Sequence, residues 1–153
     1  MENKKLKNLP ELLVQLQQDK YSGQKIVFTN GCFDILHKGH VAYLQAAKDL
    51  GDKLVLGLNS DQSVQKLKGP KRPLNNQEDR AFVLAGLESI DYIVVFYEET
   101  PHELLAEVRP DILVKGGDYK VEEVVGREFA SQTILIDFVE GYSTTKTISK
   151  MKP

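Results

Sequence analysis

The residues best suited to chemistry are His37 and His40, which follow an apolar run at 25–30 and a glycine, Gly31. If a helix begins near residue 38, the two imidazoles project the same way from its first turn. The free N–H groups and the dipole at a helix start attract anions. Gly39 would keep the helix surface flat, so that a planar or bulky group can approach the backbone. The pattern predicts a pocket for a phosphate chain.

A metal site and two unrelated surface histidines are the competing interpretations of this pair. Zinc-binding histidines on a helix usually stand four residues apart and need a third ligand. The only other histidine in the sequence is His102, on a different predicted element. The spacing therefore favours anion binding.

Three consecutive hydroxyl residues near the C-terminus, Ser143, Thr144 and Thr145, follow Gly141 and precede a predicted helix. Their hydroxyls and the N–H groups behind them could form a second anion cradle facing the first. An ordinary helix N-cap would need only one of the three. The cluster favours phosphate binding.

A further candidate group, Lys115, Gly116, Gly117 and Asp118, follows a predicted strand at 111–115. Lys115 can reach a phosphate, and the glycines permit a close backbone approach. Asp118 could hold a sugar hydroxyl or a magnesium ion. A plain tight turn is the alternative for the glycine pair.

Polar residues also follow the predicted strand at 53–59. Asn59 and Asp61 stand where a ribose or substrate hydroxyl would lie, although Asp61 is equally suited to cap the next helix. Lys68 and Arg72, with Lys71 between them, form either a mobile flap over the phosphates or a solvated charged loop. Arg80 on the next predicted helix either adds to this site or pairs with a neighbouring carboxylate such as Glu78 or Asp79.

The elements that must position these residues alternate between strands and helices. We predict strands at 25–30, 53–59, 92–97, 111–115 and 133–138, and helices at 9–19, 40–50, 61–67, 76–88, 101–108, 121–130 and from 143. Apolar strands alternating with helices predict an α/β fold, a Rossmann-like doubly wound parallel five-stranded sheet with helices on both faces. Such sheets bind ligands beyond the carboxyl ends of their strands, at the switch point of strand order.

Length and composition fit one domain over 1–153, with a helical extension at 1–23 and a catalytic core at 24–150. Of the 153 residues 41% are hydrophobic, and 20 basic against 22 acidic residues leave a net charge of −2. This balance argues against a nucleic-acid or membrane partner. A single cysteine excludes a disulfide framework. Because the sequence also lacks an apolar signal or membrane-length segment, we expect a cytoplasmic protein.

Two ordered motifs carry a family resemblance. The run from Gly31 to His40, Gly-Cys-Phe-Asp-Ile-Leu-His-Lys-Gly-His, resembles the G-x-F-D-x-x-H-x-G-H signature of cytidylyltransferase-like nucleotidyltransferases, and Gly-Tyr-Ser-Thr-Thr at 141–145 resembles their S-T-T element. The segments 58–73 and 94–119 are similar to the adenylyltransferase branch found in ADP-heptose synthases. The resemblance extends over residues 24 to 150.

The resemblance implies transfer of AMP from ATP to a sugar 1-phosphate, D-glycero-β-D-manno-heptose 1-phosphate, with release of pyrophosphate. ADP-heptose for lipopolysaccharide or another surface glycan would be the product. It makes His37 and His40 the triphosphate ligands and gives Lys115 a catalytic role. The chemistry implies Mg²⁺, which bridges phosphate oxygens and keeps several waters, so its protein ligands stay unassigned.

The turn before the histidines has related expectations. Phe33 and its neighbours, among them Gly31, would present backbone N–H groups to the phosphates. Asp34 is either a structural cap or a substrate contact. Cys32 lies in the nucleotide site, but we interpret it as a small packed side chain, because phosphoryl transfer needs no thiol nucleophile.

Three alternatives remain open. A glycerol 3-phosphate cytidylyltransferase would be expected to carry an arginine before the S-T-T element, and 137–142 has none. An FMN adenylyltransferase would share the same motifs. A nucleotide-sensing domain without turnover would be favoured by a missing histidine or a broken hydroxyl cluster. About 23 residues precede the first predicted strand, too few for a sugar kinase, so we expect a separate kinase upstream in the pathway. The resemblance also implies a possible homodimer.

Overall fold

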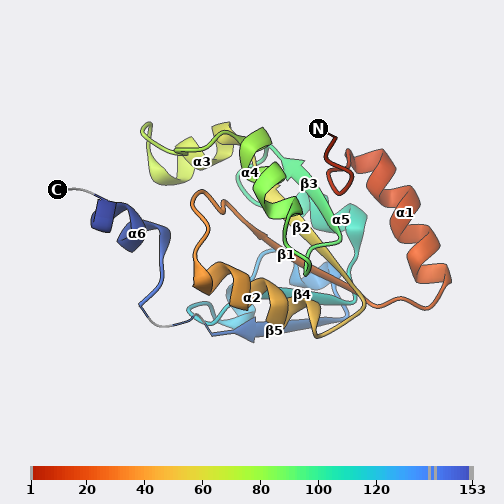
Figure 1. The fold of residues 1–153 in the computed structure, drawn as a ribbon. Helices are drawn as coiled ribbons and strands as arrows, with labels where there is room; N and C mark the ends of the chain where they lie inside the picture. The colour runs from red at the N-terminus through yellow and green to blue at the C-terminus, as the bar shows by residue number, and fades with distance from the viewer. Residues whose placement is uncertain (1, 138, 140, 152–153) are drawn as a thin grey trace.

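The computed structural model describes residues 2–137, 139 and 141–151 (Figure 1). The helices are α1 Leu9–Tyr21, α2 Lys38–Lys48, α3 Asp61–Lys68, α4 Gln77–Ala85, α5 His102–Val108 and α6 Thr144–Met151. The strands are β1 Ile26–Gly31, β2 Lys53–Asn59, β3 Tyr92–Phe96, β4 Ile112–Gly116 and β5 Gln132–Ile136. The predicted α/β class with five strands is confirmed.

The five strands form one parallel sheet in the order β3-β2-β1-β4-β5. From β1 the next two strands, β2 and β3, lie on one side, whereas β4 and β5 lie on the other side of β1. The strand order therefore reverses between β1 and β4. These two strands pair only at Val27 with Ile112 and at Phe28 with Leu113. Beyond this point β1 continues along β2, and β4 continues along β5. The carboxyl ends of β1 and β4 therefore border the switch point, where doubly wound sheets bind ligands.

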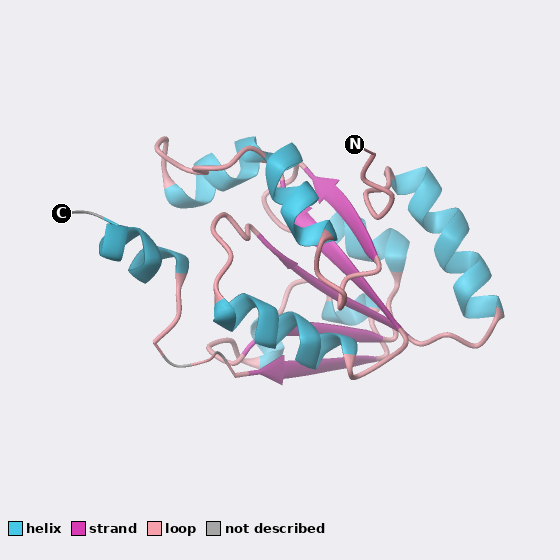
Figure 2. Ribbon diagram, viewed as in Figure 1, coloured by secondary structure: helices cyan, strands magenta, loops and turns pink. Residues whose placement is uncertain are grey.

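Helices cover both faces of the sheet (Figure 2). A separate cluster of apolar side chains fills the space on each side. One cluster contains Leu44 from α2 and Leu84 from α4, while the other contains Leu16 from α1 and Leu105 from α5. All four side chains are buried. Because helices cover both faces of β1, both faces of this strand are buried. Its sequence is therefore a continuous apolar run and does not alternate between apolar and polar residues.

The N-terminal segment covers the open edge of the sheet. Lys7 donates its N–H to the carbonyl of Ile93 at 2.8 Å, and the N–H of Ile93 donates to the carbonyl of Lys5 at 2.9 Å. Asn8 and Glu11 then form a capping box at the start of α1. The predicted helix at 9–19 is confirmed as α1, and β3 does not present its full edge to solvent.

The helix predicted at 121–130 is wrong. This segment forms two short 3₁₀ turns, η1 Val121–Glu123 and η2 Arg127–Phe129. Gly126 separates them with φ at +87°, and a Cβ on this residue would lie 2.3 Å from Cδ1 of Leu105. The left-handed backbone and the close approach to α5 break the helix. The strand predicted to extend to 138 ends at Ile136, and residue 138 lies outside the described residues.

Candidate active site

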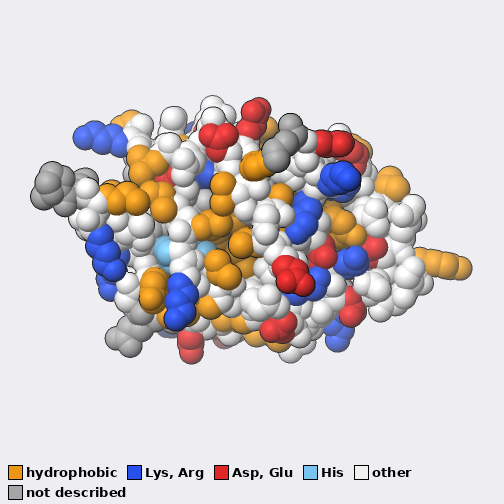
Figure 3. Space-filling model, viewed as in Figure 1, with side chains coloured by type: hydrophobic (Ala, Val, Ile, Leu, Met, Phe, Trp, Pro, Cys, Tyr) orange, Lys and Arg blue, Asp and Glu red, His pale blue; other side chains and the backbone are white. Residues whose placement is uncertain are grey.

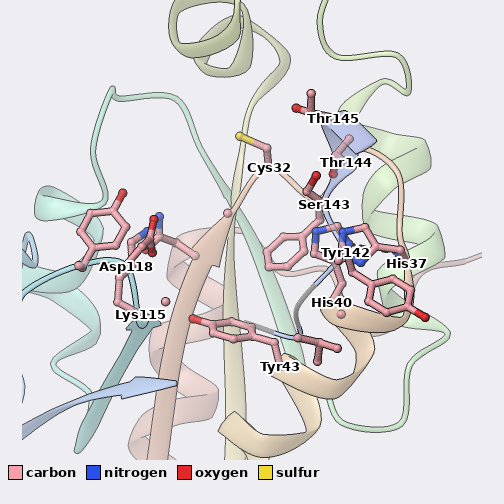
Figure 4. Close-up of a pocket in the computed structure, with 18 of the residues that line it drawn as sticks. Cys32, His37, His40, Tyr43, Lys115, Asp118, Tyr142, Ser143, Thr144 and Thr145 are labelled. Carbon is pink, nitrogen blue, oxygen red and sulfur yellow. Dashed lines mark hydrogen bonds between the residues drawn. The ribbon is translucent and has the colours of Figure 1, made fainter. Parts of the chain in front are cut away.

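A pocket of about 670 Å³ opens at the carboxyl ends of β1 and β4. The predicted site residues that line it are Gly31, Cys32, Phe33, His37, Gly39, His40, Lys68, Lys115, Gly116, Asp118, Ser143, Thr144 and Thr145. Figure 4 shows the histidines and Ser143 on one side of the pocket, with Lys115 and Asp118 on the other. In the space-filling view, histidine atoms reach the surface on the left of the molecule (Figure 3).

The two histidine rings stack at the start of α2. Their centroids lie 3.8 Å apart with 21° between the planes, and Phe33 meets His40 edge-on at 5.3 Å. A Cβ on Gly39 would lie 2.9 Å from Cε1 of His37 and 3.0 Å from Cβ of Tyr142. The absent side chain of Gly39 therefore makes room for the ring of His37 and for Tyr142.

A backbone hydrogen bond sets the tautomer of His40. The N–H of His37 donates to Nδ1 of His40 at 3.3 Å, so Nδ1 is an acceptor. In the neutral ring the proton must then be on Nε2, which leaves an N–H donor for the pocket. Burial lowers the pKa of His40 to about 4, with further lowering by the charges of His37 and Lys68. Without a ligand, His40 is neutral at pH 7.

His37 has an unpaired ring nitrogen. Its Nδ1 is buried and has no hydrogen-bond partner within the described part of the chain. Burial also lowers the pKa of this imidazole. A buried polar atom without a partner is costly, so a ligand that supplies one has an energetic advantage at this position.

The hydroxyl cluster forms another part of the pocket wall. Oγ of Ser143 accepts the N–H of Lys146 at 3.0 Å, so this residue caps α6. Thr144 is buried and Thr145 is exposed, and both line the pocket. The N-cap alternative thus accounts for Ser143, whereas the two threonines are in place to face a ligand.

Lys115 extends from β4 without a carboxylate in ion-pair contact among the described residues. Its Nζ lies 3.5 Å from Oδ1 of Asn30 and 5.1 Å from the centroid of the Tyr119 ring. Burial lowers the pKa of Lys115, against the opposing effect of Cys32 and Asp118. A partly buried cation that forms no ion pair among the described residues favours an anionic ligand.

The Cys32 sulfur lines the same pocket. Burial raises the pKa of this thiol, although the charges of Lys68, Arg80, Lys115 and Arg72 act in the opposite direction. The group is therefore a neutral thiol at pH 7, which is a poor nucleophile.

Asp34 and Arg72 do not line the pocket. The Asp34 carboxylate is buried and accepts Nε–H of Arg72 at 3.0 Å and the backbone N–H groups of Leu74 and Asn75. Burial alone would raise the pKa of Asp34, but these donors lower it below its ordinary value. Asp34 fastens the loop at 72–75 to the turn after β1, and its carboxylate holds the Arg72 side chain outside the pocket. Of the two cations predicted to form a flap over the phosphates, only Lys68 lines the pocket.

Asn59, Asp61 and Gly117 also lie outside the pocket lining. Asn59 is buried and donates Nδ2–H to Oγ of Ser63, and Asp61 pairs with Arg80 at 2.7 Å. A Cβ on Gly117 would lie 2.2 Å from Oδ1 of Asp137, which explains a glycine at this position. Arg80 does not use the neighbouring carboxylates Glu78 or Asp79.

Six further residues line the pocket that the sequence prediction of the site left out: Asn30, Tyr43, Tyr119, Val139, Gly141 and Tyr142. The hydroxyl of Tyr43 lies 2.9 Å from Oγ1 of Thr29, whose own proton goes to the carbonyl of Val114. Tyr43 is therefore the donor of that bond, and burial raises its pKa to about 12. The sequence feature that could have identified Tyr43 is its position one helical turn after His40, which places both side chains on the same face of the helix.

The described residues contain no group of three side chains suited to enclose a metal ion. Asp118 is the one carboxylate among the described lining residues. This donor set fits Mg²⁺ that is held mainly by substrate phosphates and water, with Asp118 as its candidate protein ligand. Among the described residues, no helix is both long and apolar enough to cross a membrane.

A doubly wound parallel sheet with a pocket and a helix start at its switch point is the architecture of many nucleotide-binding α/β domains. Comparison with known proteins agrees, because residues 28–150 match the family described as cytidylyltransferase-like. The chain belongs to this family of nucleotidyltransferases.

Curated relatives include the bifunctional protein HldE of Sulfurimonas denitrificans, 57% identical over 96% of this chain and 31% of that protein. The HldE proteins of Nitratiruptor and of Helicobacter pylori strain P12 are 63% and 58% identical, over 85% and 97% of the chain and 28% and 31% of their own lengths. The chain thus spans about three tenths of the length of these relatives.

Two solved structures share the fold. The lipopolysaccharide core biosynthesis protein of Thermoplasma volcanium is 30% identical with a TM-score of 0.62, over 79% of this chain and all of that one. Pantoate-β-alanine ligase of Francisella tularensis is 17% identical with a TM-score of 0.61, over 86% of this chain and 66% of that one, a likeness of fold alone.

Proposed function

We propose that the protein transfers AMP from ATP to D-glycero-β-D-manno-heptose 1-phosphate, giving ADP-heptose for lipopolysaccharide synthesis and releasing pyrophosphate. The observation that carries this proposal is that one pocket holds the stacked rings of His37 and His40 and, on its other side, Lys115, which forms no ion pair with a carboxylate among the described residues. Such a pocket can bind two anions at once. The identity of 57% to 63% with proteins named HldE supports the choice of substrate.

The histidine side of the pocket suits the triphosphate. Nε2–H of His40 is a donor fixed by its tautomer, and Nδ1 of His37 is buried without a partner in the described residues. The free N–H groups at the start of α2 add positive potential. Thr144 and Lys68 complete this side with a hydroxyl and a cation.

The Lys115 side suits the sugar phosphate. Its ammonium can neutralise the phosphate, and Asp118 at the exposed rim can accept hydrogen bonds from sugar hydroxyls. The ring of Tyr119 offers an apolar surface beside the same ammonium. A phosphate bound here would approach the triphosphate from the side opposite the histidines.

The reaction then requires only alignment and charge stabilisation. A phosphate oxygen of the sugar phosphate attacks the α-phosphorus, a new P–O bond forms, and the bond from the α-phosphorus to the bridging oxygen of pyrophosphate breaks. The attacking phosphate is already ionised, so no general base is needed. His37 and His40 stabilise charge on the α-phosphate and the departing pyrophosphate by donating hydrogen bonds. Mg²⁺, when bound with the nucleotide, supplies further neutralisation of the phosphates.

The test is pyrophosphate release with Mg²⁺ in a matrix of ATP, CTP, GTP and UTP against heptose 1-phosphate, glycerol 3-phosphate and FMN. We expect release only with ATP and the heptose phosphate. Release with CTP and glycerol 3-phosphate would replace the proposed substrates. Nucleotide binding without release for any acceptor would favour a sensing domain.

A further inference from the structure

Arg80 on α4 is the largest fully buried side chain among the described residues, yet it does not line the pocket. Its guanidinium donates to three backbone carbonyls: Cys32 at 2.7 Å, Asn59 at 2.9 Å and Asn75 at 3.0 Å. Its remaining contact is the Asp61 carboxylate at 2.7 Å. One side chain thus joins the turn after β1, the end of β2 and the loop before α4.

The bond to Cys32 fixes the orientation of one peptide plane. In a trans peptide the carbonyl of one residue and the N–H of the next point in opposite directions. Because the Cys32 carbonyl points to the buried guanidinium, the N–H of Phe33 points away from it. Phe33 lines the pocket, and its N–H donates no hydrogen bond within the described residues.

The same turn has an unfavourable backbone. Phe33 has φ at +47°, in the left-handed region that non-glycine residues rarely occupy. Gly31 accommodates the resulting position of the ring, because a Cβ there would lie 2.7 Å from Cε2 of Phe33. Such a conformation persists only where surrounding contacts hold it. The bond from Arg80 to the Cys32 carbonyl is a contact of this kind.

We infer that Arg80 is a positioning residue for nucleotide binding: it holds the Cys32–Phe33 peptide so that the Phe33 N–H faces the phosphates. This inference rests on the proposed function, because it assumes that the pocket binds a triphosphate. Arginine suits the task because its planar fork reaches several carbonyls at once. The Asp61 carboxylate partly neutralises the charge of Arg80 and accepts one of its hydrogen bonds. The other three hydrogen bonds go to backbone carbonyls.

The test compares Arg80→Lys with Asp91→Asn. Lysine keeps a positive charge near Asp61 but cannot span three carbonyls, so the turn is released. Asp91 accepts the N–H of Leu54 and pairs with Lys48 at the opposite end of β2, which makes its variant a matched loss of stability far from the pocket. We expect Arg80→Lys to weaken binding of α,β-methylene ATP by about tenfold. Asp91→Asn should bind it as the wild type does, when both are measured at a temperature where circular dichroism shows folded protein. Equal binding by the two variants would overturn the inference.

A second measurement uses the wild type and remains decisive if Arg80→Lys does not fold. In an amide NMR titration with α,β-methylene ATP, the Phe33 resonance should move downfield as its N–H donates to a phosphate. An unmoved Phe33 resonance at saturation would refute the positioning role. The proposed function has a separate readout: a wild type that binds the analogue but forms no ADP-heptose refutes that function and leaves the role of Arg80 standing. A wild type that does not bind the analogue overturns both.

Discussion

Replacing His40 by asparagine should change how the stability of the protein depends on pH. His40 is neutral in the folded protein because burial, His37 and Lys68 lower its pKa to about 4, from an ordinary 6.5. In the unfolded chain the same imidazole takes up a proton below about pH 6.5. Protonation of the unfolded state therefore lowers the free energy of unfolding as the pH falls from 6.5 to 4. Above pH 6.5 this effect is absent.

The magnitude follows from the size of the shift. A change from 6.5 to about 4 corresponds to a ceiling of about 3 kcal/mol, at roughly 1.4 kcal/mol for each pH unit. Asparagine keeps an acceptor near the position of Nδ1, so the N–H of His37 retains a partner. Because asparagine does not titrate, the variant escapes the loss.

Urea unfolding of the wild type and of His40→Asn at pH 7, 6, 5 and 4 measures this difference directly. We expect the free energy of unfolding of the variant, relative to the wild type, to rise by up to about 3 kcal/mol between pH 7 and pH 4. Asp34 and the other carboxylates titrate in both proteins and cancel. Parallel pH profiles for the two proteins would refute the assigned burial and tautomer of His40.

Other substitutions separate binding from stability. Lys115→Met removes a partly buried cation without a carboxylate partner among the described residues, so stability should change by less than about 1 kcal/mol while the acceptor KM rises about tenfold or more; a large loss of Tm with unchanged KM would make Lys115 structural. Gly39→Ala places a methyl group 2.9 Å from the His37 ring, so the KM for ATP should rise and stability should fall by about 1–3 kcal/mol. Unchanged kinetics would show that the ring is free to move. Cys32→Ser should keep kcat within about twofold, because the thiol is neutral and attacks nothing; an inactive, folded variant would contradict this. Asp34→Asn should lower the free energy of unfolding by about 1–3 kcal/mol, read by urea titration, since the loop at 72–75 loses one of its two acceptor oxygens and the charge that pairs with Arg72; an unchanged urea midpoint would contradict the fastening role.

The fold was accessible from the sequence because the strands are apolar runs that end in polar or glycine residues. The strand at 25–30 and the helix starting near residue 38 are recognisable without coordinates, and together they locate the His37–His40 pair at the switch point. The failure at 121–130 has a tertiary cause, because the left-handed Gly126 packs against Leu105 from α5. The helical propensity of the segment depends on its own residues and does not reflect this contact with a distant helix.

The sequence predicted the pocket residues that belong to a motif of fixed spacing. It did not predict which charged side chains near the pocket pair with other protein groups instead of facing a ligand. Asp34, Arg72, Asp61 and Arg80 all lie in or beside the segments that surround the pocket, and each could serve a ligand. In the structure they form ion pairs with each other, Asp34 with Arg72 and Asp61 with Arg80. Such pairing depends on distances between segments about twenty to forty residues apart, which sequence spacing does not determine.

The central claim is that this pocket joins the α-phosphate of ATP to a sugar phosphate. The most direct measurement follows two labels, one in the α-phosphate and one in the γ-phosphate of ATP, during reaction with heptose 1-phosphate and Mg²⁺. We predict that the α-label enters the sugar nucleotide and that the γ-label leaves as pyrophosphate. Appearance of the γ-label on the sugar, or of the α-label in free AMP alone, would contradict the account.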